Sequence, residues 1–373
     1  MINIKDVQAF VYRAPIETPV QTSFGLMRDR PAVFVRVQDA EGAVGWGEVW
    51  CNFPSCGAEH RARLIDTLIA PLVVQRSFSL PSKAFDWLSA QTAVLAIQTG
   101  EYGPIAQCIA GIDIAIWDLC ARKAQLPLWR YMGGDRNTVK VYASGLNPTD
   151  PEKLAAARMT EGYQAFKLKI GFGHDRDLNN LKAMREVIGD RPLMVDANQG
   201  WDLATASDMI AKLSEFNVAW LEEPLRADRP WSEWQELAKH GDTPLAAGEN
   251  VTQLEGFATA IRSGVLAVVQ PDVAKWGGLS AGLPIAKSIL KAGLRFCPHY
   301  LGAGIGLLAS AHLLAASNNN DILEVDANTN PLRSLTCLPL SHLKNGEMVL
   351  SDEPGLGTLP DTLTLREFLI DHR

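Results

Sequence analysis

The N-terminal third of the chain has a strand-like pattern that gives way to a helical one. Residues 2–14 alternate apolar and polar positions, and the apolar runs 32–37 and 43–48 flank the turn signal Asp39-Ala40-Glu41-Gly42. This pattern predicts a strand followed by a β-hairpin. Between residues 57 and 130, apolar residues recur at helical spacing. Strands followed by helices indicate an α+β domain over residues 1–130.

From residue 139 onward, short apolar runs alternate with stretches of helical pattern. Eight of these runs have the length and composition of buried strands: VKVYASG, AFKLKIG, PLMVDAN, VAWLEEP, LAAGEN, AVVQPDV, RFCPHY and DILEVD. Strands that alternate with helices are typical of a parallel sheet. We therefore expect an α/β domain of eight parallel strands, which can close into a barrel, over residues 131–349.

Seven of these runs deliver a charged or hydrogen-bonding residue at or just past their ends, at a nearly constant interval. These residues lie 23 to 27 positions apart and are Lys169, Asp196, Glu222, Glu249, Asp272, His299 and Glu324. In a barrel of strand–helix units they converge on the carboxyl-terminal face, where such barrels hold their active sites. A single polar strand end is also what contact with solvent produces. Seven in the same register, all of acid–base or ligand type, favour a shared site.

Three neighbouring strand ends carry carboxylates, namely Asp196, Glu222 and Glu249. Packed together without a counter-charge, they would repel one another and some would stay protonated. Mg²⁺ relieves such repulsion because it prefers oxygen ligands and keeps positions open for water or substrate. No His or Cys stands among the three, which argues against zinc. The pattern predicts a magnesium site, and surface carboxylates at loop starts are the alternative.

Lys169 and His299 are the candidate acid–base groups. Lys167 shares a strand face with Lys169, and we expect the crowding of two ammonium groups to lower a lysine pKa toward that of a useful base. Asp272 can accept a hydrogen bond from the His299 ring and set its tautomer. Glu324, if protonated, can donate to a developing enolate oxygen. These groups together permit removal of a proton α to a carboxylate.

Composition narrows the expected partners and location. The 373 residues are 47% hydrophobic and 21% charged, and 35 Lys and Arg against 42 Asp and Glu give a net charge of −7. This charge argues against a nucleic-acid partner, and no run of about 18 apolar residues suggests a membrane span. The six cysteines are scattered without a C-x-x-C pair, and the N-terminus lacks a signal-peptide pattern. We expect free thiols and a cytoplasmic location.

Several motifs follow one another along the chain: Lys167-x-Lys169, Val195-Asp196-Ala197-Asn198, Glu222-Glu223-Pro224, Gly248-Glu249-Asn250, Gln270-Pro271-Asp272, Lys275-x-Gly277-Gly278, Pro298-His299 and Glu324. This set resembles the mandelate racemase subgroup of the enolase superfamily, the mandelate racemase/muconate lactonizing enzyme family, whose sites combine a Lys or His base with Mg²⁺. The resemblance implies a modified TIM barrel, (β/α)7β, over residues 131–349 and an N-terminal α+β capping domain over residues 1–130. It also implies that residues 350–373 pack with the capping domain and that the protein is a homo-oligomer.

The same resemblance implies a role for each site residue. Asp196, Glu222 and Glu249 would bind Mg²⁺, Lys169 and His299 would be the acid–base pair, Asp272 would orient His299, and Glu324 would donate to the substrate carboxylate. Lys167, Asn198 and Lys275 match positions that line such sites. The capping loops Thr22–Arg28 and Cys51–His60 are expected to contribute specificity, with Arg28 and His60 as candidate substrate contacts. For these two, loop residues without a binding role are the alternative.

The expected substrate is a small-molecule carboxylate. A looser similarity to galactarolactone cycloisomerase and acid-sugar dehydratases is carried by Lys167-Leu168-Lys169-Ile170-Gly171-Phe172-Gly173, Asn330-Pro331-Leu332-Arg333 and Pro354-Gly355-Leu356-Gly357. It implies proton abstraction to a metal-stabilised enediolate, then dehydration or lactone cycloisomerisation. A racemase or epimerase of α-hydroxy acids is the alternative. Readings from other classes are a Schiff-base aldolase on Lys169 and a non-catalytic small-molecule-binding homologue.

Two glycine-rich segments are similar to phosphate-binding loops. They are Gly171-x-Gly173 and Gly302-x-Gly304-x-Gly306. Neither completes the pattern G-x-G-x-x-G, so a nucleotide site is not favoured.

Overall fold

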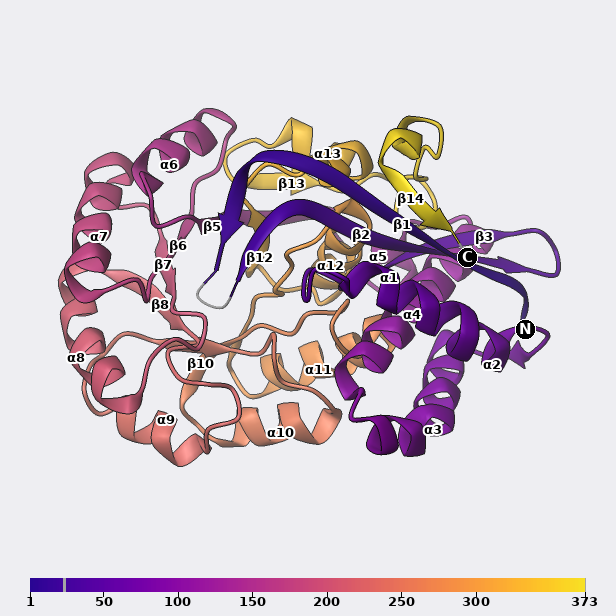
Figure 1. Cartoon of the computed structure of the whole chain (residues 1–373), viewed down its shortest axis with the longest axis horizontal. Coiled ribbons are helices and arrows are strands. Elements are labelled where there is room, and N and C mark those ends of the chain that lie inside the picture. The colour runs from indigo at the N-terminus through magenta and orange to yellow at the C-terminus, as the bar shows by residue number, and fades with distance from the viewer. Residues whose placement is uncertain (23–24, 373) are drawn as a thin grey trace.

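Two sheets organise the chain in the computed structural model, which describes residues 1–22 and 25–372 (Figure 1). The first sheet is antiparallel, with strand order β14-β1-β2-β3 and β4 added at β1. Its strands are β1 (Ile2–Gln21), β2 (Leu26–Asp39), β3 (Val44–Val49), β4 (Ser77–Phe78) and β14 (Leu369–His372). The helices of this part are α1 (Gly57–Leu64), a π-helical segment (Ile65–Ile69), α2 (Ala70–Val73), α3 (Pro81–Thr99), α4 (Tyr102–Lys123) and α5 (Leu128–Tyr131).

β2 and β3 form the hairpin that the turn signal predicts, and they pair antiparallel along the whole of β3. In the turn, the Asp39 carboxylate accepts hydrogen bonds from the amides of Glu41 (3.0 Å) and Ala43 (2.9 Å). Asp is favoured in turns because its side chain can bond to nearby backbone in this way. β1 is longer than predicted because it pairs with β2 again near its end, where Gln21 lies opposite Leu26.

α4 packs directly on β3 because β3 carries glycines where the two meet. A Cβ at Gly45 would lie 2.0 Å from the carbonyl oxygen of Ala115, and one at Gly47 would lie 1.9 Å from that of Gly111. Any side chain here would push the helix off the sheet. Among the described residues, α4 is the one helix long and apolar enough to cross a membrane, and 83% of its most apolar stretch of 18 residues is buried inside the protein. Its apolar character matches its place in the core.

The second sheet is a nearly closed barrel of eight parallel strands in the order β11-β10-β9-β8-β7-β6-β5-β12, with β13 added at β5. The strands are β5 (Thr138–Leu146), β6 (Phe166–Lys169), β7 (Leu193–Asp196), β8 (Val218–Glu222), β9 (Leu245–Ala247), β10 (Leu266–Val269), β11 (Arg295–Phe296), β12 (Ile322–Asp326) and β13 (Glu347–Val349). The α-helices are α6 (Pro151–Thr160), α7 (His174–Ile188), α8 (Leu203–Leu213), α9 (Trp231–Leu237), α10 (Leu254–Arg262), α11 (Gly278–Lys291), α12 (Gly304–Ala316) and α13 (Pro331–Thr336). Short 3-10 helices cover Ser214–Phe216, Leu338–His342 and Thr364–Phe368.

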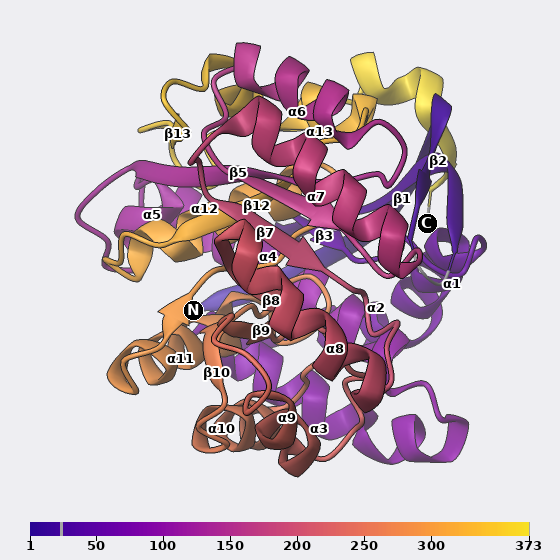
Figure 2. The same ribbon diagram turned by 90° about the vertical axis from the view of Figure 1, so that its left-hand side faces the viewer.

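An α-helix follows each of the first seven barrel strands, which confirms the eight predicted strands and the (β/α)7β architecture. The view in Figure 2 shows α7 and α8 in front of the strands, on the outside of the barrel. This arrangement leaves the carboxyl ends of the strands together at one end of the barrel.

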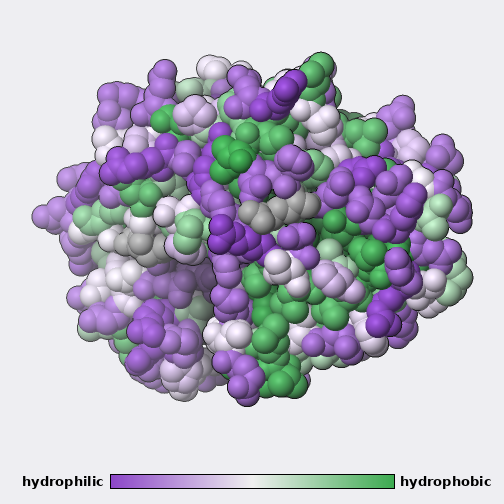
Figure 3. Space-filling view, turned by 45° about the vertical axis from the view of Figure 1, so that its right-hand side comes forward, coloured by the Kyte–Doolittle hydropathy of each residue, from purple (hydrophilic) through white to green (hydrophobic). Residues whose placement is uncertain are grey.

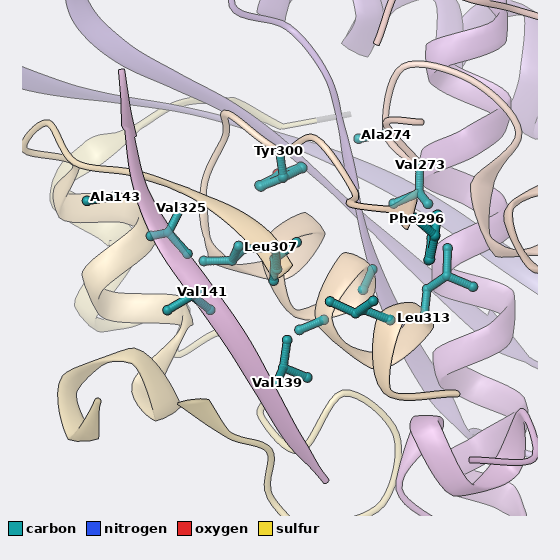
Figure 4. Packing of buried hydrophobic residues seen from close by; sticks show 14 of the residues in the cluster. Val139, Val141, Ala143, Val273, Ala274, Phe296, Tyr300, Leu307, Leu313 and Val325 are labelled. Atoms are coloured by element: carbon teal, nitrogen blue, oxygen red, sulfur yellow. The ribbon is translucent and has the colours of Figure 1, made fainter. Parts of the chain in front are cut away.

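Alternate side chains of a barrel strand face opposite ways. On the outer face, Val139 and Val141 of β5 lie toward Leu307 and Leu313 of α12 (Figure 4). On the inner face, a separate cluster fills the barrel, made of Tyr142, Ala165, Met194, Trp220, Ala246, Val268 and Cys297. The barrel interior is therefore a packed core, and the charged groups of the inner face gather above it, at the strand ends.

Two buried carboxylates from the first 130 residues bind the N-termini of barrel helices. Glu48 of β3 accepts hydrogen bonds from the amides of Ala303 (2.6 Å) and Gly306 (2.8 Å) at the start of α12. Asp113 of α4 accepts from two amides at the start of α11 (2.7 and 2.9 Å). Helix N-termini favour negative charge, yet burial raises the pKa of both carboxyls to about 7. The glycine-rich turn at Gly306, which is similar to a phosphate loop, is thus occupied by a carboxylate of the protein.

β1 and β2 reach from the first sheet to the barrel (Figure 1). Arg30 of β2 pairs with Asp326 at the end of β12, and both side chains are buried. The amide of Gln21 donates to the side-chain oxygen of Asn147, just after β5, at 3.3 Å. These contacts place the ends of β1 and β2 that lie nearest the barrel at the carboxyl ends of the barrel strands. The last strand, β14, pairs with β1, while the domain boundaries at residues 130 and 350 stay predictions.

Candidate active site

The ends of β6, β7 and β8 bring three of the candidate residues side by side. In the parallel register, Lys169 lies opposite Asp196, and Asp196 lies opposite Glu222. All three side chains are buried. Residues two apart on a strand share a face, so Lys167 also enters the barrel interior, one layer below Lys169.

Glu249, Asp272 and His299 follow the ends of β9, β10 and β11 by two or three residues. The turn before Glu249 requires a glycine, because Gly248 has a φ of +151° and a Cβ there would lie 2.5 Å from the amide nitrogen of Gln270. The backbone can therefore pass close to the neighbouring strand. This close passage carries Glu249 over the barrel end toward His299.

Lysine–carboxylate pairs connect these strand ends. Lys167 Nζ lies 2.6 Å from Glu222 and 2.7 Å from Glu324. Lys169 Nζ lies 2.5 Å from Asp196. Burial is the largest influence on the pKa of Lys169 and lowers it, but Asp196, Glu222 and Glu324 together raise that pKa above its ordinary value. The pKa of Lys167 likewise lies well above its ordinary value, because Glu222 and Glu324 outweigh the effect of its burial. Lys167 does act to lower the pKa of Lys169, but the expected net lowering is wrong because the neighbouring carboxylates outweigh this effect.

His299 is held by carboxylates on both of its ring nitrogens. Nδ1 lies 2.7 Å from Asp272, while Nε2 lies 2.8 Å from Glu249 and 3.5 Å from Glu324. Burial lowers the pKa of His299, but Glu249 and Glu324 raise it well above its ordinary value. Lys275 Nζ lies 3.2 Å from the same Glu249, and these two cations hold the pKa of Glu249 well below its ordinary value against the effect of burial.

The charges and donor atoms of this cluster suit a hard divalent cation. Its six acidic residues are Asp196, Glu222, Glu223, Glu249, Asp272 and Glu324, against Lys167, Lys169, Lys275 and His299. Burial raises the pKa of Glu222 to about 7 and that of Glu223 well above its ordinary value, helped by neighbouring carboxylates. Oxygen donors with excess negative charge are what Mg²⁺ requires. In residues 1–22 and 25–372, no three His, Cys, Asp or Glu side chains stand close enough together to hold a metal ion. The ammonium groups of Lys169 and Lys167 lie against Asp196 and Glu222.

A cavity of about 310 Å³ opens onto this cluster. On the barrel side its lining includes Lys169, Asn198, Glu249, Lys275 and His299. Residues from the first 130 complete the wall: Thr22, Met27, Trp50, Asn52, Phe53 and Gln107. Asn198 also donates through Nδ2 to Asp196 at 3.0 Å. Lys169 and His299 thus face one space from β6 and from the loop after β11, which lie on different sides of the barrel.

Two family models cover nearly the whole chain. The model described as Mandelate racemase / muconate lactonizing enzyme, N-terminal domain, matches residues 5–133, and the model described as Enolase C-terminal domain-like matches residues 151–363. The chain belongs to the mandelate racemase/muconate lactonizing enzyme family.

Solved structures and relatives agree with this membership. A crystal structure of a mandelate racemase/muconate lactonizing enzyme from Bordetella bronchiseptica RB50 is 55% identical, with a TM-score of 0.93 over 98% of this chain and 99% of that one. D-galactarolactone cycloisomerase from Agrobacterium fabrum is 28% identical over 98% of this chain and 99% of its own length. A racemase structure from Streptomyces coelicolor A3(2) with bound magnesium is 26% identical, with a TM-score of 0.87 over 98% and 100% of the two chains.

Membership in this family makes the chain an enzyme of the enolase superfamily. Its relatives are acid-sugar dehydratases, cycloisomerases and racemases. Family neighbours with bound magnesium support a magnesium cofactor. The roles assigned to single residues of this chain stay predictions.

The two capping loops border the cavity as expected for this family, but through residues other than Arg28 and His60. Arg28 is exposed on β2, while its neighbour Met27 lines the cavity, because adjacent strand residues face opposite ways. His60 lies on α1, outside the cavity lining, and pairs with Glu101 at 2.9 Å. Neither residue lines the cavity, and their assignment as substrate contacts stays a prediction. Residues 23 and 24 of the first loop lie outside the described residues.

Sequence reasoning missed several polar side chains at the site. Gln270 donates through Nε2 to Glu222 at 2.7 Å, and Asn250 donates to both oxygens of Glu223 at 3.0 and 2.9 Å. Gln270 and Asn250 stand inside the motifs that carry the family resemblance, which was a signal for both. Gln107 is a polar residue in an otherwise apolar stretch of α4, and this was the signal for its place in the cavity wall.

A second cavity, of about 490 Å³, lies between α3, α4 and the loops that follow β9 and β10. None of its described lining residues carries a carboxylate, an imidazole or an amine. Ile97, Tyr102 and Leu254 line it and are exposed, and Figure 3 shows apolar side chains gathered in a band on a mostly hydrophilic face. The candidate acid–base groups Lys169 and His299 line the first cavity and not this one.

Proposed function

We propose that this enzyme abstracts the proton α to the carboxylate of an acid sugar or its lactone and then expels the β-oxygen. It would be an acid-sugar dehydratase or a lactone cycloisomerase. The observation that carries this proposal is that Lys169 and His299 share the lining of one cavity. Two proton-transfer groups on different sides of one substrate allow one to take a proton and the other to give one.

The cofactor in this proposal is Mg²⁺, held by Asp196, Glu222 and Glu249. When bound, Mg²⁺ stabilises the negative charge that develops on the substrate carboxylate. The oxygens of Glu324, on β12, lie next to Lys167 (2.7 Å), to the amide of Tyr300 (3.3 Å) and to Nε2 of His299 (3.5 Å). A protonated Glu324 would donate to the substrate carboxylate.

In the proposed reaction, the base takes the α-proton, and the electron pair of that C–H bond forms the double bond to the β-carbon. The C–O bond at the β-carbon breaks, and its oxygen receives a proton from the opposite group. Dehydration releases this oxygen as water and leaves an enol, which tautomerises to a 2-keto-3-deoxy acid. In a lactone, the leaving oxygen belongs to the ring and stays in the product. Asp272 holds the His299 ring through Nδ1 at 2.7 Å, so that Nε2 serves as the proton-transfer atom.

Racemisation or epimerisation is the second candidate. The same pair of groups favours it, because a proton removed on one face of the α-carbon can be returned on the other. The two candidates differ only in whether a leaving group departs from the β-carbon.

Proton NMR in D₂O with Mg²⁺ tests the proposal on a panel of acid sugars, their lactones and aryl hydroxy acids. We expect loss of the α-proton signal together with new methylene signals of a deoxy product. Exchange at the α-carbon without a new product would instead establish the racemase. Absence of exchange across the panel, with Mg²⁺ binding verified by calorimetry, would refute the proposed substrate class.

Single substitutions separate the two proton-transfer groups. Lys169→Met and His299→Asn should each slow product formation by about 10²- to 10⁴-fold, the usual contribution of a positioned acid or base. A racemase would lose turnover in both variants, whereas a lyase would keep α-proton exchange in one of them. The controls are Lys182→Met and His342→Asn, which change exposed residues of the same types. Unchanged rates in both site variants would remove Lys169 and His299 from the mechanism.

A further inference from the structure

The described part of the cavity wall that the first 130 residues contribute is uncharged. Its six described residues are Thr22, Met27, Trp50, Asn52, Phe53 and Gln107, and none of them carries a charge. The cationic groups of the cavity all come from the barrel: Lys169, Lys275 and His299. Each of these is already paired with a carboxylate, at 2.5, 3.2 and 2.7 Å. No described cation therefore faces the end of a substrate that lies away from the catalytic groups.

Gln107 has its amide orientation set from behind. Arg61 is buried and donates through Nε to the Gln107 side-chain oxygen at 2.9 Å. A guanidinium has donors only, so the oxygen of Gln107 must face Arg61 and its NH₂ group must face elsewhere. None of the described residues accepts a hydrogen bond from that NH₂ group, and Gln107 lines the cavity. The NH₂ group is therefore a donor available to a bound molecule.

Asn52 presents a hydrogen-bond acceptor to the cavity, where Gln107 presents a donor. Its side-chain nitrogen donates to the carbonyl oxygen of Leu301, which leaves the side-chain oxygen as the acceptor of the pair. The cavity wall thus offers one amide donor, from Gln107, and one amide acceptor, from Asn52. A hydroxyl group both donates and accepts, so substrate hydroxyls match this pair. Trp50 and Phe53 supply apolar surface beside it, which suits the C–H faces of a sugar chain.

A second substrate carboxylate would bind unfavourably at this wall. It would lose water against Trp50, Phe53 and Met27, and no described cation would compensate the loss. Burying a charge without a partner is far more costly than burying a hydroxyl that is hydrogen-bonded. It would also meet the acceptor oxygen of Asn52.

We infer that the substrate is a monocarboxylic acid sugar with a neutral, hydroxylated end, and that Gln107 selects against dicarboxylic acid sugars. This inference rests on the proposed function, because it assigns the one carboxylate to the barrel end of the cavity. Gln107 is a specificity residue in direct contact with the substrate. Arg61 is a positioning residue that acts through Gln107.

The test compares acids that differ only at the far end. Galactonate with galactarate, and gluconate with glucarate, are matched pairs in which a CH₂OH group replaces a carboxylate. Binding to the full chain with saturating Mg²⁺ is measured by calorimetry, and α-proton exchange is measured separately by NMR in D₂O. We expect a monocarboxylate of at least one pair to bind tenfold or more tightly than its dicarboxylate. Equal or tighter binding of both dicarboxylates, or no binding of any of the four, would overturn the inference.

The two measurements keep the two proposals apart. Exchange with dicarboxylates alone would leave the proposed proton abstraction standing and refute the inference. Tighter binding of a monocarboxylate without exchange in any compound would support the inference about the cavity and count against the proposed reaction.

Substitutions at Gln107 give the second arm. Gln107→Arg adds a cation at the wall and should shift the ratio of the two affinities toward the dicarboxylate by tenfold or more. Gln107→Met, of similar length and uncharged, is the matched control and should weaken the monocarboxylate without favouring the dicarboxylate. Arg61→Lys should raise KM for the monocarboxylate and leave kcat nearly unchanged, with folding checked by thermal unfolding. An affinity ratio that is the same in Gln107→Arg as in the unchanged chain would overturn the role of Gln107.

Discussion

Glu48 ties the first sheet to the barrel immediately beyond His299, and its removal should be costly. The substitution Glu48→Ala leaves the amides of Ala303 and Gly306, now bonded at 2.6 and 2.8 Å, without an acceptor in a buried place. Each orphaned buried donor costs about 1–3 kcal/mol, so the pair costs about 2–6 kcal/mol. The lost carboxylate at the start of α12 adds about 0.3–2 kcal/mol, the range for a charge at a helix terminus.

One effect acts in the opposite direction. Burial raises the pKa of the Glu48 carboxyl to about 7, so part of its charge is already lost at neutral pH and the helix-terminus contribution is reduced. We therefore expect Glu48→Ala to lower the free energy of unfolding by about 3–5 kcal/mol, most of it from the two orphaned amides. The free energy of unfolding of Glu48→Gln should lie between that of the unchanged protein and that of Glu48→Ala, because glutamine keeps one acceptor oxygen but turns its NH₂ group toward an amide N–H.

Urea unfolding followed by tryptophan fluorescence measures the effect, since the chain holds ten Trp residues. The control is Glu17→Ala, which removes an exposed carboxylate from β1. A change of less than about 0.5 kcal/mol in Glu48→Ala, the usual scatter of surface substitutions, would refute the view that this carboxylate joins the two sheets.

Three further predictions concern pH, a buried ion pair and the cofactor. Burial raises the pKa of both Glu48 and Asp113 to about 7 from ordinary values of 4.5 and 3.8. The folded state then binds more protons than the unfolded one, so the contribution of these two groups to stability is full at low pH and is lost as pH rises from about 4 to about 7. Urea midpoints measured at several pH values should fall with rising pH, and they should fall less steeply in Glu48→Gln. Asp326→Asn leaves the buried Arg30 without its partner and should cost about 3–5 kcal/mol in the same urea assay, and an unchanged midpoint would contradict that. Mg²⁺ at about 100 times its Kd should stabilise the folded protein by about 2.7 kcal/mol. EDTA should abolish this gain in stability, and Glu249→Gln should reduce it. An equal gain in the unchanged protein and in Glu249→Gln would exclude Glu249 as a ligand.

The barrel strands, and the residues that meet at their carboxyl ends, could be predicted from the pattern of residues along the chain. Strand and helix periodicities differ, so the eight strands from residue 138 to residue 326 are visible as short apolar runs. Parallel strands joined by helices place all their carboxyl ends on one face. For this reason Lys169, Asp196 and Glu222 could be grouped before any contact was known, and their register in β6, β7 and β8 follows from the same rule.

Which charged groups pair with one another could not be predicted, because the partners come from strands far apart in the chain. Lys167 pairs with Glu222 and Glu324 from two other strands, and those distances reverse the direction of pKa shift that sequence neighbours suggest. Local pattern likewise cannot tell which residue of a loop faces inward, and Met27, not its neighbour Arg28, lines the cavity. The orientation of the Gln107 side chain in the cavity wall depends on its contact with Arg61, which is far from it in the sequence. Charge interactions and hydrogen bonds depend on distances in space, whereas sequence periodicity reports only which side of its own element a residue occupies.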